Sequence, residues 1–365
     1  MTTVREVIQI IEDFAPPCYQ ESYDNSGMQI GDASCTLTGI LLCIDVTDDV
    51  VEEAIIIGAN LIISHHPLIF SGIKRLSGSN YIEKAIIKAI KYDISIYSCH
   101  TNIDNVSLGV SFKMGEKIGL ARMQVLRPLT SNLCKLVAFV PNSHADVVRK
   151  AIFEAGAGHI GNYDCCSYNL AGEGTFRALE PANPFVGEKN ILHKEPEIRM
   201  ETIFPKFLEN TIVSALLKVH PYEEVAYDIY PLINHQKNAG AGVIGEFEKP
   251  METIGFLQNL KTIFGIPVIR HTEIINENIL KVALCGGSGS FLLPDAKKAH
   301  ADAFVTSDFK YHQFFDAERL ILIADIGHYE SEQFTLEIFY DLLVKNFSNF
   351  AIHFTKVKTN PINYF

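Results

Sequence analysis

The chain has 365 residues, more than one hydrophobic core usually accommodates, so we expect two or three domains. Its formal net charge of −12 disfavours a protein that wraps nucleic acid, because phosphate contacts need clustered Lys and Arg side chains. No apolar run approaches the roughly 20 residues of a membrane span, and the N-terminal MTTVREVIQIIEDF lacks the apolar core of a signal peptide. We therefore expect a cytoplasmic globular protein that does not enter a membrane.

The cysteines predict free thiols rather than a disulfide framework or a zinc ribbon. None of them has CxxC spacing, and several lie in apolar, strand-like runs. Because free cysteine is among the most frequently buried residue types, we expect buried, reduced thiols. The residues concerned are Cys18, Cys35, Cys43, Cys99, Cys134, Cys165, Cys166 and Cys285.

The first hundred residues alternate between helix-like and strand-like runs. Helices are predicted at Val4–Phe14, Asp49–Ala59 and Tyr81–Tyr92, and strands at Gly39–Asp45, Asn60–Ser64 and Ile94–His100. This alternation favours an α/β fold with a mainly parallel sheet, in which ligands bind at the carboxyl ends of the strands. His65, His66 and His100 all stand at such strand ends.

The last third of the chain repeats this pattern. Runs that begin at Ile279, Ala299 and Leu320 parallel the three earlier strands, and the second of them places Ser307 and Asp308 where His65 and His66 stand. We interpret residues 1–125 and 236–365 as two pseudo-repeated α/β lobes that form one discontinuous domain. The alternative is the chance similarity of βαβ units.

Between the lobes, residues 126–235 follow a different order of elements. Strand, helix, two strands, helix and strand are predicted in succession, which is the order of a ferredoxin-like α+β domain. We therefore expect a domain inserted into the host fold, at a point where the ends of the host chain lie close together.

A dinuclear metal site is the main functional prediction. Just beyond a strand end, with Pro67 bending the chain, His65 and His66 can each address a different ion. Imidazole and carboxylate ligands together suit divalent Zn, Mn, Fe, Co or Ni. Carboxylates can also bridge two closely spaced cations.

The acids for this site come from a repeated spacing. His100 precedes Asp104 by four residues, and His328 precedes Glu332 by four, so each pair shares one face if the segment is helical. An isolated HxxxE is weak evidence, and a solvated helix start is its ordinary explanation. Its repetition after corresponding strands favours ligands. The predicted ligands are His65, His66, Asp104, His328 and Glu332.

Other polar residues on the same strand ends are candidates for supporting roles. His100, Asp308 and His312 could orient a ligand or transfer protons, or could be ordinary hydrogen-bonded structural residues. Asp325 could hold an imidazole or cap the exit of its strand. The glycines of Gly286–Gly289 favour a tight turn over an anion-binding loop, because the GK[ST] ending of a P-loop is missing.

These motifs resemble the NIF-three-like family, whose bacterial members are often labelled GTP cyclohydrolase I type 2 homologues. The resemblance covers essentially the whole chain and is carried by YDNSGMQIGD, GANLIISHHPLIF, CHTNID, NPFVG, HPYEEVAYDIYPL, ALCGGSGS, DAFVTSDFKYH and ADIGHYESEQF. Two positions depart from the family pattern: Tyr23 stands where Trp is frequent, and Ser307 where Gly is common. Neither is a predicted ligand.

The resemblance implies more than the residues alone. It places His66 and Asp104 on one metal, His65 and His328 on the other, and Glu332 between the two. It also implies a homohexameric ring and an insert similar to CutA and PII-like domains, with HPYEEVAYDIY as the shared signature.

Two functions follow from these observations. The first is a metal-dependent hydrolase acting on a cyclic or nucleotide-like small molecule, with His100 or His312 as general acid or base. The second is a non-enzymatic regulatory or interaction protein, in which the metals are structural and the insert binds a ligand or partner. Fold alone does not separate these functions.

Overall fold

The computed structural model describes residues 2–130, 132–347 and 350–365. The chain forms two compact units, of which the first combines Met1–Arg127 with Asn238–Phe365 and the second is Pro128–Lys237. The sequence prediction placed the corresponding boundaries at 126 and 235. The first unit is therefore built from both ends of the chain.

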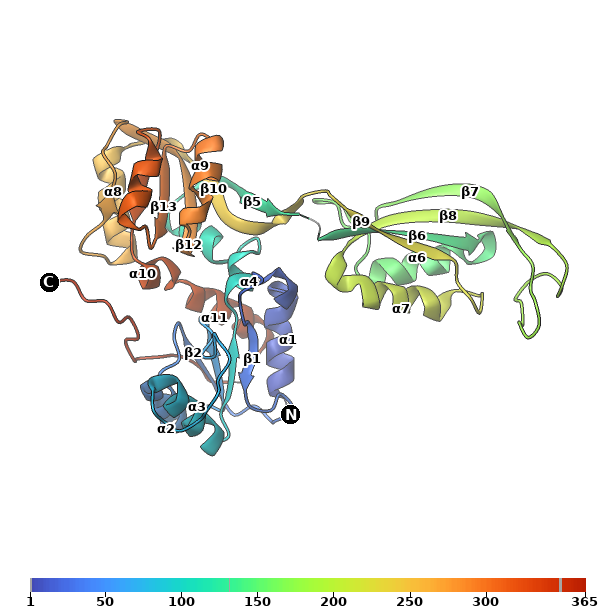
Figure 1. The fold of residues 1–365 in the computed structure, drawn as a ribbon, viewed down its shortest axis with the longest axis horizontal. Helices are drawn as coiled ribbons and strands as arrows, with labels where there is room; N and C mark the ends of the chain where they lie inside the picture. The colour runs from blue at the N-terminus through green and yellow to red at the C-terminus, as the bar shows by residue number, and fades with distance from the viewer. Residues whose placement is uncertain (1, 131, 348–349) are drawn as a thin grey trace. The chain divides into compact units, whose positions relative to one another are not determined.

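One sheet of the first unit has the strand order β1-β4-β3-β2-β15. Neighbours among β4, β3, β2 and β15 run parallel, whereas β1 pairs antiparallel with β4. Figure 1 shows β1 and β2 near the N-terminal helix of the chain. The bounds are β1 Gly27–Ile30, β2 Ile40–Cys43, β3 Leu61–Ser64, β4 Ser95–Ser98 and β15 Ile352–Phe354.

Helices pack on this sheet because its strands are apolar on both faces. α2 (Asp48–Ile57) and α3 (Tyr81–Lys91) share a buried cluster with alternate strand residues, including Leu41, Ile62 and Ile96. α1 (Val4–Phe14) contacts α11 (Thr335–Asn346), which also contacts β2. α1 begins with a capping box between Thr3 and Glu6, a sequence signal of a helix start.

The second sheet of this unit has the order β11-β14-β13-β12-β10-β5. β12, β13 and β14 run parallel to one another, whereas β10 pairs antiparallel with β12 and β11 pairs antiparallel with β14. The bounds are β5 Ala121–Leu129, β10 Gln236–Glu252, β11 Arg270–His271, β12 Asn278–Ser288, β13 Ala303–Ser307 and β14 Leu322–Asp325.

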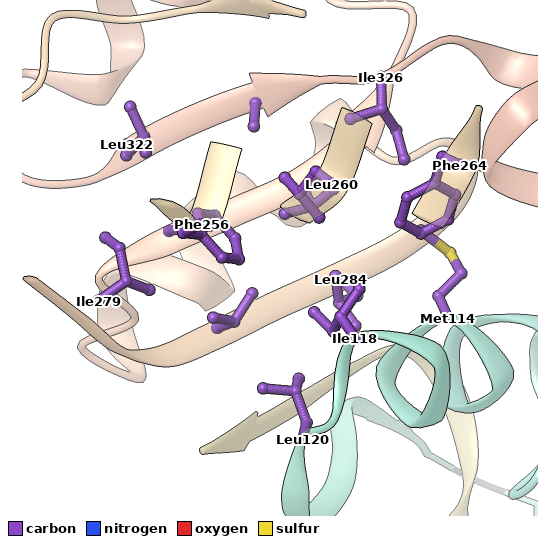
Figure 2. Packing of buried hydrophobic residues seen from close by; sticks show 14 of the residues in the cluster. Met114, Ile118, Leu120, Phe256, Leu260, Phe264, Ile279, Leu284, Leu322 and Ile326 are labelled. Carbon is purple, nitrogen blue, oxygen red and sulfur yellow. The ribbon is translucent and has the colours of Figure 1, made fainter. Parts of the chain in front are cut away.

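The two faces of the second sheet are covered by different helices. α8 (Thr253–Phe264) and α5 (Val110–Ile118) pack on one face, and α9 (Leu293–Lys298) lies with Phe304 and Ile323 on the other. Figure 2 shows the first of these clusters, with the labelled residues Met114, Ile118, Leu120, Phe256, Leu260, Phe264, Ile279, Leu284, Leu322 and Ile326.

The sheets exchange elements across the expected lobe boundaries. α5 comes from the N-terminal part of the chain but packs in the core of the second sheet. β15 comes from the C-terminal end but extends the first sheet, with Ile352 opposite Ile40. A salt bridge of 2.7 Å between Lys117 of α5 and Glu337 of α11 joins the exchanged helices. The amphipathic pattern of α5 predicts burial but does not specify the sheet that it covers.

The second unit has the element order β6-α6-β7-β8-α7-β9 and an antiparallel sheet of order β7-β8-β6-β9. Both helices pack on one face, where Val148 and Ile212 meet Leu136 and Met200. The bounds are β6 Leu133–Pro141, α6 Ala145–Glu154, β7 Ser167–Phe176, β8 His193–Pro205, α7 Glu209–Val219 and β9 Tyr227–Leu232. Short 3-10 helices lie at Pro17–Tyr19, Asn142–His144, Lys206–Leu208, Ser290–Leu292 and Tyr311–Ala317.

The cysteines are free thiols, but the prediction that they are buried holds only for some of them. Cys43, Cys99, Cys134 and Cys285 are buried, Cys166 is intermediate, and Cys18, Cys35 and Cys165 are exposed. The exposed cysteines lie outside the regular strands, where no sheet covers them. Among the described residues, no helix is long and apolar enough to cross a membrane.

The α8 core offers a test of this packing. Phe256 is fully buried, whereas Ile254 on the same helix is 57% exposed. We expect Phe256→Ala to lower the free energy of unfolding by about 3–5 kcal/mol, because it leaves a cavity. The matched change Ile254→Ala should alter it by less than about 0.5 kcal/mol. Urea unfolding followed by circular dichroism measures both values, and equal losses would contradict the packing described.

Candidate metal centre

His65 and His66 follow β3 at the carboxyl end of the first sheet. Their backbone N–H groups donate to the carbonyl oxygens of Cys43 and Ile44, at 3.1 and 2.9 Å, so the parallel pairing continues past the strand. The carbonyl oxygen of His66 accepts hydrogen bonds from the hydroxyls of Ser64 and Ser98. These bonds fix the turn, and the two imidazole ring centroids lie 4.9 Å apart.

His100 and Asp104 stand at the two ends of one short helical turn. α4 (Thr101–Asp104) follows β4 directly, and His100 is the residue that precedes it. The ring of His100 lies 5.3 Å from the rings of both His65 and His66. Asp104 Oδ1 lies 3.9 Å from His65 Nε2. The carboxyl ends of β3 and β4 therefore bring these side chains together, as their positions in the sequence predicted.

His328 and Glu332 come from the second sheet and lie on one face of a helix. α10 (His328–Glu332) follows β14. Gly327 precedes α10 and has a φ of 91°, a backbone conformation that favours glycine. His328 Nε2 lies 3.2 Å from Glu332 Oε2 and 3.2 Å from His66 Nε2. Glu332 Oε2 is also 3.0 Å from His66 Nε2. Side chains from both sheets thus meet within the first unit.

Each imidazole of the cluster is held through its Nδ1 atom. A hydrogen-bond acceptor on Nδ1 fixes the proton there and leaves the Nε2 lone pair for the cluster, which is the usual arrangement of metal-ligating histidine. The pairs are His65 Nδ1 with the Cys99 carbonyl oxygen (3.0 Å), His66 with Asp45 (2.7 Å), His100 with Asp24 (2.7 Å) and His328 with Asp308 (2.6 Å).

The buried donor atoms of this cluster fit a divalent cation. His65 Nε2, Asp104 Oδ1 and Glu332 Oε2 are buried and have no hydrogen-bond partner among the described residues. Glu332 Oε2 is close to imidazole nitrogens, but with the protons on Nδ1 those nitrogens present lone pairs. Buried lone pairs that face one another without a hydrogen-bond donor cost folding free energy. A cation between them can interact with all of them at once.

The charges around the cluster also favour a cation. Burial works against a charged imidazole, yet the hydrogen bond to Asp45 and the adjacent carboxylate of Glu332 raise the pKa of His66 to about 10. Burial likewise opposes the charged form of His328, but Asp308 and Glu332 raise its pKa to about 11. Burial, followed by the charge of Glu332, raises the pKa of Asp104 well above its usual value. The local field is therefore strongly negative.

The ligand atoms fall into groups that differ from the pairing implied by the family resemblance. Atoms of His65, Asp104 and Glu332 lie within 4.8 Å of one another, and so do atoms of His66, His328 and Glu332. The resemblance had placed His66 with Asp104, and His65 with His328. Both assignments separate His65 from His66, and they differ in which of the two histidines stands with Asp104. His65, His66 and His100 form a third such group.

The glycine stretch at the end of β12 makes room for a carboxylate. A Cβ atom at Gly287 would lie only 2.2 Å from Glu332 Oε1, and its φ of +61° also favours glycine. The backbone N–H groups of Gly286, Gly287 and Gly289 donate to the hydroxyls of Ser111, Ser331 and Thr306. These N–H groups are thus engaged within the protein, which argues against an anion-binding loop. The predicted tight turn is wrong for Gly286 to Ser288, because these residues are the end of β12.

The remaining candidates have separate positions. Asp308 orients His328, as described above. Within the described residues, Asp325 has no hydrogen bond or ion pair with an imidazole. It accepts from the backbone N–H of Phe309 at 3.0 Å and from Arg270, so it caps the strand exit. The exposed His312 packs its ring on Tyr311 and Phe315, with centroids at 5.1 and 6.4 Å, and it belongs to none of the ligand groups found among the described residues.

Two residues with clear roles were missed in the sequence. Asp45 ends the first predicted strand, and Asp24 lies in the YDNSGMQIGD segment. Burial opposes ionisation of Asp24, but hydrogen bonds from His100 and Thr101 hold its pKa well below the usual value. The signal present in the sequence was an acidic residue at the end of a strand, near a strand end that is followed by histidine. Which acid contacts which histidine can be identified only in the folded chain.

The comparison with protein families gives one match across the chain. A family model described as Duf34/NIF3 (NGG1p interacting factor 3) matches residues 2–361.

Named relatives and solved structures agree with this match. Proteins named GTP cyclohydrolase 1 type 2 homolog are similar to the chain. That of Halalkalibacterium halodurans is 41% identical over 324 residues, with 88% of this chain and 87% of the relative covered. That of Bacillus subtilis is 38% identical over 327 residues, with 89% and 88% covered. A crystal structure of a Bacillus cereus protein related to NIF3 is 36% identical with a TM-score of 0.86, covering 100% of this chain and 99% of that one. The mixed α/β architecture with several sheets is shared with this solved protein.

The role of Asp45 can be tested separately from the ligands. Asp45→Asn removes the charge that holds His66 Nδ1, so we expect the affinity for Zn²⁺ or Mn²⁺ to fall about 10–100-fold. Asp49→Asn, an exposed change in the first turn of α2, should leave the affinity unchanged. Competition with a fluorescent chelator measures both. Equal affinities in the two variants would show that the Asp45 contact does not support metal binding.

Proposed function

Because this chain belongs to the Duf34/NIF3 family, we propose that it binds two divalent metal ions and hydrolyses a cyclic or nucleotide-like small molecule. The proposed ligands are His65, His66, Asp104, His328 and Glu332. His65 and Asp104 would hold one ion, and His66 and His328 the other. The metal is a divalent Zn, Mn, Fe, Co or Ni, because the donors are imidazole nitrogens and carboxylate oxygens.

The proposal of two ions rests on Glu332, whose two carboxylate oxygens face different groups of proposed ligands. Its Oε1 atom lies 3.4 Å from His65 Nε2, while its Oε2 atom lies 3.0 and 3.2 Å from the Nε2 atoms of His66 and His328. A carboxylate whose oxygens face different donor sets is suited to bridge two cations. Glu332 is only 2% exposed, so water does not hydrogen-bond to these oxygens in place of a cation.

Five ligands shared by two ions would leave coordination positions for substrate and water. Structural zinc is usually closed by four protein ligands, whereas catalytic sites keep open positions. When bound, the metals would supply Lewis acidity toward a hydrolysable bond. The protein would supply the rest of the chemistry, which is orientation and proton transfer.

His100 is the proposed proton-transfer residue. Its Nδ1 atom is fixed on Asp24, and its ring lies beside His65 and His66, so its Nε2 can take or give a proton at the cluster. The contact with Asp24 holds the His100 ring in one orientation. His312, the other candidate from the sequence, has no comparable partner acid among the described contacts.

Aromatic side chains beside His100 support a ring-shaped substrate. The Phe70 ring lies 6.2 Å from the His100 ring, and the Tyr23 ring lies 6.5 Å from Phe70. Phe70 is 51% exposed and Tyr23 63% exposed, so both offer free ring surface next to the cluster. Flat aromatic surface favours stacking with a heterocycle. The name of the relatives, GTP cyclohydrolase 1 type 2 homolog, agrees with a nucleotide ring as substrate.

A non-enzymatic function is the alternative, since the family description names an interacting factor rather than an enzyme. In that case the metals would be structural, and the unit of residues 128–237 would bind a ligand or partner. We also propose, from the family resemblance, that this unit is a CutA/PII-like domain and that the protein assembles as a homohexameric ring. These proposals hold for either function.

Metal content tests the ligand assignment. We expect roughly two equivalents of Zn²⁺ or Mn²⁺ per chain after loading and desalting, measured by inductively coupled plasma mass spectrometry. Glu332→Ala should lose both ions because it removes the shared ligand, whereas His65→Ala should retain at most one. His353→Ala, an exposed histidine of β15, serves as the control and should retain both. Unchanged metal content in Glu332→Ala would remove the proposed site.

Turnover tests the hydrolase. A screen of the loaded protein over nucleotides, pterins and small cyclic amides should identify a substrate, and His100→Ala should lower its turnover by about 100–10,000-fold with metal content retained. Loss of metal in this variant would instead make His100 a ligand. A large loss of turnover in His312→Ala alone would move proton transfer to that residue. Turnover that survives Glu332→Ala would contradict a metal-dependent hydrolase.

A further inference from the structure

The second unit contains a cavity that none of the proposed metal ligands line. It has a volume of about 680 Å³. Its walls include Phe139 of β6 and Glu197 and Arg199 of β8, which alternate with the strand residues packed against α6 and α7. Alternation along a strand places these side chains on the face of the sheet opposite the helices. The volume is in the range of about 300–1,000 Å³ typical of small-molecule sites.

A buried carboxylate without a cationic partner lies in this cavity. Glu197 is only 8% exposed, and Tyr222 donates its hydroxyl proton to Glu197 Oε1 at 3.0 Å. Among the described residues no Lys, Arg or His forms a salt bridge with Glu197. The nearby Arg199 pairs with Glu201 instead, at 3.0 Å. Buried carboxylates are normally paired, because losing hydration is costly.

The backbone of β7 leaves space for this carboxylate. A Cβ atom at Gly174 would lie 2.2 Å from Glu197 Oε2, so a larger residue there would displace it. One carboxylate oxygen is thus occupied by Tyr222, while the other lies against glycine and has no hydrogen bond within the described structure. An acceptor of this kind is complementary to an N–H donor of a ligand.

Aromatic rings form the wall next to Glu197. The Tyr222 ring lies 5.8 Å from Phe176 and 6.3 Å from Phe185. The backbone N–H of Asn183 donates to Glu223 at 2.9 Å, which ties the segment that carries Phe185 to the segment that carries Tyr222. This contact joins the two segments that carry the rings, and the rings offer flat apolar surface beside Glu197.

We propose that this cavity binds a flat aromatic or heteroaromatic compound that carries a cationic or N–H donor group, with Glu197 accepting from that group and Phe176, Phe185 and Tyr222 contacting the ring. The buried acceptor selects the donor group, and the rings favour a planar body, with added attraction for a cation. A carboxylate ligand is disfavoured, because the residues that line the cavity include four glutamates and two arginines. The site is independent of the metal centre and of the hydrolase proposal.

Benzamidine is the probe, because it joins a planar ring to an amidinium group that can donate two hydrogen bonds to one carboxylate. Titration calorimetry of the full-length protein should detect benzamidine binding and no binding of benzoate, which has the same ring and the opposite charge. Glu197→Gln should weaken benzamidine binding by at least about tenfold. Glu195→Gln is the matched control two residues earlier in β8, since Glu195 pairs with His193 and does not line the cavity.

A second variant keeps the proposal testable if Glu197→Gln does not fold. Phe176→Leu leaves Glu197 intact and removes one aromatic wall, so benzamidine should bind about three- to tenfold more weakly. The proposal is overturned if wild type does not bind benzamidine up to about 10 mM. It is also overturned if benzoate binds equally well, or if Glu197→Gln and Glu195→Gln bind benzamidine alike.

Discussion

The crowding of acceptor atoms at the ends of two sheets is the constraint on which the first unit depends. His65, His66, His100 and His328 are each held through Nδ1, so their Nε2 lone pairs are left for the partly buried carboxylate of Asp104 and the buried carboxylate of Glu332. Without a positive charge between them these groups repel one another. The fold therefore has to hold them together against this repulsion, using interactions outside the cluster.

The exchange of elements between the sheets supplies those interactions. α5 is buried in the core of the second sheet, although it follows the Asp104 segment of the first sheet. β15 extends the first sheet, although it comes after the strands of the second sheet in the chain. Both sheets thus bury apolar surface contributed by the other half of the chain. Burial of this kind is worth roughly 25 cal/mol per Å² and does not depend on the charge state of the cluster. It can hold His66 and Glu332 within 3.0 Å of each other.

The sequence predicted those parts of the site that depend on local pattern. The strand before His65 and the four-residue spacing of His328 and Glu332 are local features, and the structure places both at strand ends. The roles of Asp24 and Asp45 depend on which loops meet after folding, so no spacing indicated them. The division of ligands into groups was implied differently by resemblance, because a list of motifs contains no distances. The sheet against which α5 packs could not be predicted either, because the sequence motifs contain no distances.

The number of cations can be argued from the charges that surround the cluster. Asp104 and Glu332 lie within it, and Asp24, Asp45 and Asp308 bind the outer nitrogens of its imidazoles. With neutral imidazoles, one divalent ion would leave three of these five carboxylate charges unbalanced, whereas two ions would leave one. A buried excess of negative charge is costly, as the raised pKa of Asp104 beside Glu332 indicates. Electrostatic balance therefore agrees with the proposal of two ions, in which the imidazoles would be neutral ligands with their protons on Nδ1.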